Sequence, residues 1–557
     1  MRKSSARVLH LICEWTRAFR EEEGRHARVS ADQVAGRSLR CEDVRVTKTT
    51  ARAGLFAMEG VHPVMAALVV AGVAAVGWAP DLANSLLLDE TLTAWVVQDG
   101  LAEAIDRTLR FQPQPAYNIF MWFWTRVAGV SEIALRLPSL LAALAACVAI
   151  ARLGTRLTKD PETGLLAAVV FATSWNVYRE SIDARSYMLG LIVLLCLALS
   201  LIRWIEQGRS RDAWFCGVLA VLLPHLHFFF VLTYPALFIY GWLRRSDARW
   251  ERKQFLLVAA LLGVGALLYL PIGLMLAAQG GSYSFVPTPR WRSLFEVFVW
   301  AAPVSGLLAG IAVVGVFGSD TKRAEATGLE PVGLGETSAA DLVSLPRESS
   351  AFLATWMLVP LLLLFGVSMA TEMSIFLGRY LIPAIPAVCL FYAVALRRID
   401  SGPARVVAVL VIAFASLAIH HRPYDDFRGA AEAVNEFVAK DASTPVLLAS
   451  GLIEGEDVKW LRDPELADYL NTPAKAYPID GRLVTLPRQL KDHPMTSGIV
   501  GPILSRGEAF ALVEWYGNGA RATRWLIARA ERVGYTADPR SFGGVRVVFF
   551  EPKAPRR

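Results

Sequence analysis

Residues 187–204, YMLGLIVLLCLALSLIRW, decide the fold of this chain. The stretch carries one charged residue, Arg203, and is close to the roughly 20 residues that a helix needs to span a bilayer. Similar apolar blocks recur throughout the 557 residues, of which 54% are hydrophobic and 19% charged. Soluble proteins carry about 25% charged residues, and a disordered chain does not contain so much apolar surface. The sequence therefore predicts a polytopic α-helical membrane protein.

The apolar blocks predict a mainly α fold with about 11–13 transmembrane helices. The short aromatic run 115–128 is typical of an interfacial or re-entrant helix. The other predicted spans are 63–80, 134–157, 164–178, 187–204, 212–224, 227–243, 255–276, 294–317, 351–370, 379–396 and 404–420.

Basic residues gather in alternate connecting segments, as the positive-inside rule predicts for an N-terminus on the inner side. This pattern accounts for the net charge of +7 and makes nucleic acid an unexpected partner. The segment 319–350 is predicted to be an inner loop. The inner clusters are Arg152, Arg156 and Lys159; Arg203, Arg209 and Arg211; Arg244, Arg245, Arg249, Arg252 and Lys253; and Arg397 and Arg398.

Three regions follow from this topology. Residues 1–60 form a polar, Arg-rich cytoplasmic tail that we expect to be weakly ordered, and Met58 is an alternative start of translation. Residues 61–420 form the transmembrane domain, in the plasma (inner) membrane. Residues 421–557 form a small exoplasmic α/β domain, because helical and strand patterns alternate there. The predicted helices are 430–441, 508–516 and 520–533, and the predicted strands are 444–450, 497–502 and 545–550.

Two groups of ionisable residues lie in the first outer turns. Asp89 and Glu90 directly follow the first span and could act as a general base or bind a metal, or they could be an ordinary solvated pair. In the next outer turn, Glu180 and Asp183 would share one face if that turn is helical. Arg185 could bind a phosphate there, and the alternative is an ion-paired helix end.

Two further outer positions carry polar side chains. His225 and His227 lie at a turn between short spans, where they could bind a metal, move a proton or only stabilise the fold. Arg379 begins a span on its outer side, where a phosphate partner would explain it and snorkelling to lipid headgroups is the alternative. Under the predicted topology, all four positions open on the same face of the membrane.

The combination of these motifs resembles the GT-C glycosyltransferases, of the family 39/83 type related to aminoarabinose transferases and protein mannosyltransferases. The resemblance implies a polyprenyl-phosphate-linked sugar as donor and a lipid, a glycan or a protein as acceptor. The resembling stretches are LLLDETLTAW (86–95), QPQPAYNIFMWFWTRVAGVSEIALRLPSLL (112–141), YRESIDARSYMLGL (178–191), HLHFFFVL (225–232), GRYLIPAIPAV (378–388) and DDFRGAAEAVNEFV (425–438).

The resemblance also assigns roles to residues of these stretches. It implies an acidic motif at Asp89 and Glu90, an Asp-Ala-Arg-x-Tyr motif at Asp183, Arg185 and Tyr187, and a His-aromatic pair at His227 and Phe228. It also implies an Arg-Tyr-Leu-x-Pro motif at Arg379, Tyr380 and Pro383.

These assignments lead to a mechanistic hypothesis. Asp89, supported by Glu90, takes the proton of the acceptor in a single displacement that inverts the anomeric centre. Asp183 with His227 would hold a divalent metal ion as cofactor, or would orient the arginines instead. The competing hypothesis is a transporter or lipid-linked sugar flippase without transferase chemistry. The residues that we expect to bind the donor phosphate are Arg185, Arg379 and Tyr380.

Overall fold

The computed structural model describes most of the chain from residue 61 onward. The predicted tail 1–60 and most of the predicted span 294–317 and loop 319–350 lie outside the described residues. The residues described are 61–278, 288–294, 346–371, 374–399, 401–419, 425–456, 458–487, 494–514 and 520–553.

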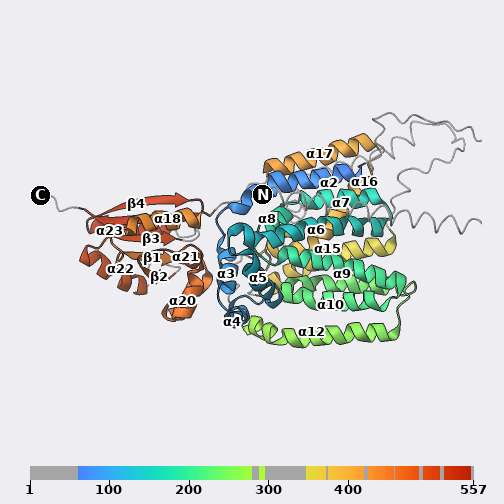
Figure 1. Ribbon diagram of the computed structural model, residues 1–557, viewed down its shortest axis with the longest axis horizontal. Coiled ribbons are helices and arrows are strands. Elements are labelled where there is room, and N and C mark those ends of the chain that lie inside the picture. The colour runs from blue at the N-terminus through green and yellow to red at the C-terminus, as the bar shows by residue number, and fades with distance from the viewer. Residues whose placement is uncertain are drawn as a thin grey trace, which may run out of the picture. The chain divides into compact units, whose positions relative to one another are not determined.

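Long helices packed against one another make up most of residues 61–419 in the described part (Figure 1). They are α2 (Pro63–Gly72), which continues through η1 (Val73–Trp78) and η2 (Ala79–Ala83), α6 (Glu132–Thr158), α7 (Pro161–Ala172), α9 (Tyr187–Gln207), α10 (Ser210–Leu226), α11 (Tyr234–Leu243), α12 (Arg252–Ala278), α15 (Arg347–Ala370), α16 (Ile385–Arg397) and α17 (Gly402–Ile419). Shorter elements connect them: α3 (Leu88–Val97), α4 (Leu101–Phe111), α5 (Pro115–Ala128), α8 (Trp175–Ser181), η3 (Phe228–Thr233) and η6 (Gly378–Ala384).

The predicted membrane fold is confirmed. Within the described residues, six helices are long and apolar enough to cross a membrane: Pro63–Ala83, Glu132–Thr158, Tyr187–Gln207, Arg252–Leu274, Arg347–Ala370 and Gly378–Arg397. Three shorter apolar helices are Pro161–Ala172, Phe228–Leu243 and Gly402–Ala418. The predicted span 164–178 is two helices, because the extended backbone of Ser174 separates α7 from α8.

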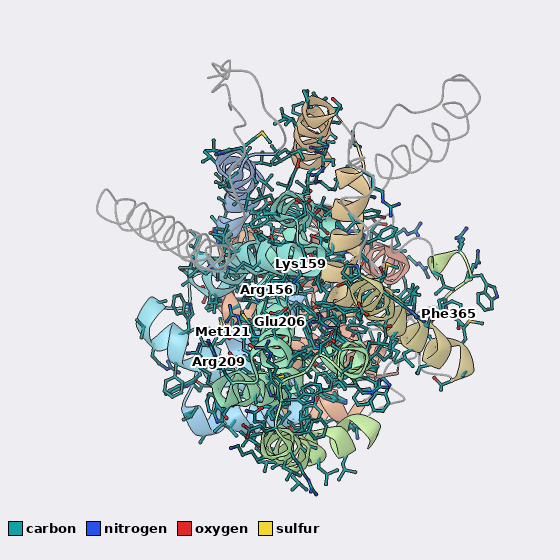
Figure 2. The ribbon with its side chains drawn as sticks, turned by 90° about the vertical axis from the view of Figure 1, so that its right-hand side faces the viewer. Met121, Arg156, Lys159, Glu206, Arg209 and Phe365 are labelled. Carbon is teal, nitrogen blue, oxygen red and sulfur yellow. The ribbon has the colours of Figure 1, made fainter. Side chains whose placement is uncertain are left out.

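Ion pairs join helix ends at the connecting loops. Arg156 near the end of α6 contacts Glu206 near the end of α9 at 2.8 Å, and Lys159 lies 3.9 Å from the same carboxylate (Figure 2). Arg397 at the end of α16 contacts Asp160 at 2.8 Å, directly before α7. Basic residues of two predicted inner loops thus have acidic partners at the ends of neighbouring helices.

The C-terminal region contains a five-stranded sheet in the order β2-β1-β3-β5-β4 (Figure 1). β2, β1 and β3 are parallel, with Leu447 beside Val484 and Leu512, whereas β5 is antiparallel to both β3 and β4. The strands are β1 (Pro445–Ala449), β2 (Arg482–Leu486), β3 (Phe510–Glu514), β4 (Tyr535–Phe542) and β5 (Val545–Pro552). The helical elements are α18 (Phe427–Val438), η7 (Ile453–Glu456), α19 (Val458–Arg462), α20 (Pro464–Leu470), α21 (Thr472–Ala476), α22 (Pro494–Arg506) and α23 (Ala520–Arg532).

Helices cover both faces of this sheet, which confirms the small α/β domain. α18 packs on one face through residues such as Val434, and α22 and α23 pack on the other through Ile503 and Leu526. Two predictions within the domain were wrong. Residues 508–516 contain strand β3 and not a helix, because both faces of the strand are buried and its first four residues form a continuous apolar run. Residues 497–502 lie in α22 and not in a strand, since Val500 and Ile503 form one buried helical face.

Candidate active site

The loop after η2 leads into α3, and the two acidic residues at the start of α3 lie in different surroundings. Asp89 and Glu90 both lie in the first turn of α3. The Glu90 carboxylate accepts a hydrogen bond from the backbone N–H of Leu87 at 2.7 Å, which caps the helix. Its side chain is completely buried, whereas 35% of the Asp89 side chain is exposed. Asp89 is thus partly exposed to solvent, whereas the adjacent Glu90 is buried.

Asp89 is held by two arginines from distant parts of the chain. Arg185, in the turn between α8 and α9, donates to Asp89 Oδ2. Arg379, at the start of η6, donates to the same oxygen at 2.7 Å. Both arginine side chains are largely but not completely buried. The structure therefore brings together three of the residues that the sequence predicts to share a site.

The opposite charges of Asp89 and the two arginines stabilise each other's ionised forms. Burial would raise the pKa of the Asp89 carboxyl, but the Arg185 and Arg379 guanidinium groups lower it to about 2. Burial would also lower the pKa of Arg185, and the charge of Asp89 raises it instead. The ion pairs are therefore fully formed at neutral pH. Because the pKa of Asp89 lies below its usual value of 3.8, their stabilising effect is present above about pH 4 and disappears as the pH falls through 2.

Glu90 forms a buried ion pair with Arg136 of α6. Arg136 Nε lies 2.7 Å from Oε1 and Nη2 lies 2.5 Å from Oε2. Glu90 Oε1 also accepts from the backbone N–H of Ala184 at 2.8 Å. The other donors of Arg136 bind backbone carbonyls of Asp81, Leu82, Asn84 and Ser85 at 2.6–3.1 Å. Glu90 thus connects α3 and α6 to the residue before Arg185, and does not share the partly exposed position of Asp89.

Arg136 is a residue that the sequence analysis missed. It lies inside an apolar block, and a charged residue in a membrane-spanning helix is expensive without a partner. The cost of burying Arg136 could have identified it from the sequence, because it predicts an acidic partner on a neighbouring segment. The partner itself could not be chosen among the acidic residues of the connecting loops without the structure.

Replacing Arg136 with methionine is expected to destabilise the protein strongly. Loss of one partner of a buried ion pair typically costs about 3–5 kcal/mol, because Glu90 would remain buried and charged after losing Arg136. The double variant Glu90→Gln/Arg136→Met should recover part of this loss. The measurement is thermal unfolding of the full chain in detergent.

The matched control for this prediction is Arg110→Met. Arg110 pairs with Glu465 at 2.7 Å, and both side chains are exposed, so its loss should cost no more than about 1 kcal/mol. Equal melting temperatures for the Arg136 and Arg110 variants would contradict the structural role of the buried pair.

The segment between α8 and α9 is a turn and does not continue the helix. α8 ends at Ser181, so Glu180 and Asp183 do not share a helical face. Glu180 Oε1 accepts from Arg179 Nη2 at 2.7 Å. Asp183 is buried, and its backbone carbonyl accepts from the N–H of Arg185 at 2.8 Å. This compact turn fixes the backbone from which Arg185 extends.

Aromatic rings pack beneath the two arginines. The guanidinium of Arg185 lies 5.2 Å from the ring centre of Tyr187, and that of Arg379 lies 5.3 Å from the ring centre of Tyr380. The buried ring of His227 packs between these tyrosines, 4.6 Å from Tyr187 and 6.4 Å from Tyr380. His227 therefore belongs to the layer of rings that supports both arginines.

The sequence also predicts Asp183 and His227 as possible ligands of a divalent metal ion. Among the described residues, no group of three or more His, Cys, Asp or Glu side chains is arranged to hold a metal ion. His225 does not join His227, since its Nδ1 lies 2.8 Å from the carbonyl oxygen of Val221. The predicted divalent ion at Asp183 and His227 therefore stays a prediction.

The chain is similar to several solved structures at low identity. ArnT from Cupriavidus metallidurans in the apo state is 12% identical with a TM-score of 0.49, and covers 88% of this chain and 99% of its own. The same protein bound to undecaprenyl phosphate is 13% identical with a TM-score of 0.47 and the same coverage. The mycobacterial arabinofuranosyltransferase AftD is 15% identical with a TM-score of 0.47, and the match covers 89% of this chain and 40% of AftD.

A family model gives the sequence match that bears on function. Residues 112–253 match the model described as dolichyl-phosphate-mannose-protein mannosyltransferase, whereas no curated protein matches the chain. The matched segment includes Arg136, Asp183, Arg185 and His227. The match agrees with the predicted resemblance: over this quarter of the chain, the sequence is similar to the protein mannosyltransferases.

Proposed function

We propose that the protein transfers a sugar from a polyprenyl-phosphate donor to an acceptor on the exoplasmic side of the plasma (inner) membrane. The observation that carries the proposal is the sharing of one partly exposed carboxylate, Asp89, by Arg185 and Arg379. Two guanidinium groups that converge on one position can bind a phosphate there, because their fixed N–H donors match the arrangement of its oxygens. The name of the matching family supports this class of donor, since it describes a dolichyl-phosphate sugar.

In this proposal, the donor phosphate replaces Asp89 as the partner of the two arginines. Arg379 Nε supports the exchange, because it is buried and has no hydrogen-bond partner among the described residues. A phosphate oxygen would satisfy this donor. Once the arginines bind the phosphate, Asp89 loses the two charges that lower its pKa, and the carboxylate becomes able to accept a proton.

The reaction is then a single displacement. The acceptor oxygen or nitrogen forms a bond to the anomeric carbon while the bond from that carbon to the phosphate oxygen breaks. The electron pair of the broken bond leaves with the polyprenyl phosphate, where Arg185 and Arg379 stabilise the growing charge. The acceptor proton passes to Asp89, and the anomeric centre inverts.

The other predicted residues have supporting roles in this proposal. Glu90 positions the backbone beside Arg185 through Ala184, and Asp183 fixes the same turn. Tyr380 and His227 belong to the ring layer under the arginines. We assign Asp183 and His227 to orienting the arginines, and the proposed steps do not pass through a metal ion.

The exchange of partners predicts a change in pH dependence when the donor binds. In the free protein, Asp89 has a pKa of about 2, so kcat/KM for the donor should stay level down to mildly acidic pH. In the donor complex the pKa of the released carboxylate should be higher, and kcat should fall at a higher pH than kcat/KM. The measurement is a pair of pH profiles from pH 4 to 8. Coinciding acid limbs would contradict the exchange.

Envelope glycans test the proposed function in the cell. We expect mass spectrometry of glycans, lipids and envelope proteins to find an acceptor that loses one sugar residue in cells lacking the protein. Restoring the wild-type chain should restore the sugar, and restoring Asp89→Asn should not. Identical profiles with and without the protein would contradict the proposal.

A further inference from the structure

We infer that the C-terminal α/β domain positions Asp89 through Tyr477 and Thr472, so that both are positioning residues for transfer. The inference rests on the proposed role of Asp89. Its basis is a set of contacts between this domain and residues 85–92, on both sides of Asp89 in sequence. Figure 1 shows α21 next to α3, and the two helices are in contact.

Tyr477 holds the backbone just before α3. Its hydroxyl accepts a hydrogen bond from the N–H of Leu86 at 2.8 Å and donates one to Glu132 Oε1 at 2.8 Å. Burial raises the pKa of Tyr477 to about 12, so the hydroxyl keeps the proton that it donates. Tyr477 thereby ties the start of the Asp89 loop to the first residue of α6.

Thr472 holds α3 just after Asp89. Its hydroxyl lies 3.0 Å from the hydroxyl of Thr91, and both side chains are buried. Thr91 uses its own proton for the carbonyl oxygen of Leu88 at 2.7 Å. Thr472 is therefore the donor of this hydrogen bond, and a residue without a hydroxyl at position 472 would leave the oxygen of Thr91 with one partner fewer.

Apolar residues on both sides of Asp89 also pack with residues of the C-terminal domain. Leu88 is buried in the core of the C-terminal domain, against residues of α18 such as Phe427. Leu86 and Leu92 are buried in a second cluster that includes Leu470. Leu86, Leu88 and Leu92 thus lie in apolar clusters that include residues of the domain, whereas Asp89 faces the arginines.

A polar contact adds to this attachment. The backbone N–H of Arg428, in α18, donates to Ser85 Oγ at 3.2 Å. The Arg428 side chain also pairs with Glu132, the carboxylate that Tyr477 contacts. Glu132 therefore connects α6 to two residues of the C-terminal domain.

This arrangement has a kinetic consequence. The donor phosphate binds Arg185 and Arg379, which belong to other segments, so a shift of α3 should leave donor binding nearly intact. The distance between the Asp89 carboxylate and the acceptor proton should change, and a 1 Å error in placement can lower a rate by about 10²-fold. We therefore expect Tyr477→Phe and Thr472→Val each to lower kcat by about 10-fold without raising KM for the donor.

The experiment uses the full chain in membranes, with a radiolabelled polyprenyl-phosphate sugar as donor. Thr472→Ser should keep the wild-type kcat, because it keeps the hydroxyl. Tyr535→Phe is the matched control, since Tyr535 is a buried tyrosine of the same domain whose hydroxyl donates to the Glu508 carbonyl at 3.0 Å, away from α3. In the Asp89→Asn background, Tyr477→Phe should cause no further loss.

A second readout separates this inference from the proposed function. In an Asp89→Cys variant, the thiol reports the position of residue 89 through its rate of modification by a water-soluble methanethiosulfonate. Adding Tyr477→Phe should shift this rate, and adding Tyr535→Phe should not. If the wild-type chain transfers no sugar, the proposed function fails and the labelling rates still test the inference.

Three results would overturn the positioning role. The first is an unchanged kcat in both Tyr477→Phe and Thr472→Val. The second is an equal loss for Tyr535→Phe, which would indicate general destabilisation of the domain. The third is a labelling rate at position 89 that does not respond to Tyr477→Phe.

Discussion

Replacing Asp89 with asparagine is expected to lower the rate of sugar transfer by about 10²–10⁴-fold, the usual contribution of a general base. The amide has nearly the same shape as the carboxylate, but it cannot take the acceptor proton. It also removes the negative charge that Arg185 and Arg379 share. The measurement is the initial rate of transfer in membranes that contain equal amounts of folded protein.

Asp99→Asn is the control for this substitution. Asp99 lies just beyond the end of α3 and pairs with Arg107 at 2.6 Å. The Asp99 side chain is 47% exposed, and ion pairs of a solvent-exposed carboxylate contribute little. The same change in chemistry should therefore leave transfer at the wild-type rate. An Asp89→Asn variant as active as Asp99→Asn would rule out Asp89 as the base.

The second large effect is expected for the arginines. Arg185→Gln and Arg379→Gln should each lower transfer by about 10²–10³-fold, because each removes a donor aimed at the charge that develops on the leaving phosphate. Both variants should also bind undecaprenyl phosphate more weakly than the wild-type chain. The measurements are kcat, KM and direct binding of undecaprenyl phosphate alone.

The two arginines share one oxygen of Asp89, so their effects should not add. The double variant should lose less than the product of the two single losses. Arg110→Gln is the control, because Arg110 is an exposed arginine in α4. Undiminished binding and transfer in either single variant would contradict a shared phosphate site.

Much of the membrane architecture could be predicted from the sequence, because spanning helices need long apolar blocks whatever their neighbours are. The same pattern predicted that Asp89, Arg185 and Arg379 lie on one face of the membrane. Their direct contact is a stronger result, since topology fixes a side of the bilayer and not the position within it. The structure supplies that contact.

The different environments of Asp89 and Glu90 could not be predicted. Adjacent residues at the start of a helix point in different directions, and which of them meets Arg136 depends on how α3 packs on α6. The contact of Tyr477 with Leu86 was equally inaccessible, because it joins segments 391 residues apart and leaves no local pattern.

The errors in the C-terminal domain have a simpler cause. Short apolar runs such as 497–502 and 510–514 do not distinguish a buried helix face from a buried strand. The surrounding sheet decides between them, since β3 lies between β1 and β5 and is covered on both faces.

The most direct test is to follow a radiolabelled polyprenyl-phosphate sugar in sealed vesicles that contain the wild-type chain or Asp89→Asn. The account predicts that the wild-type chain produces free polyprenyl phosphate and moves the label to an acceptor, and that Asp89→Asn does neither. Intact donor carried across the bilayer without cleavage would instead indicate a flippase and would contradict the account.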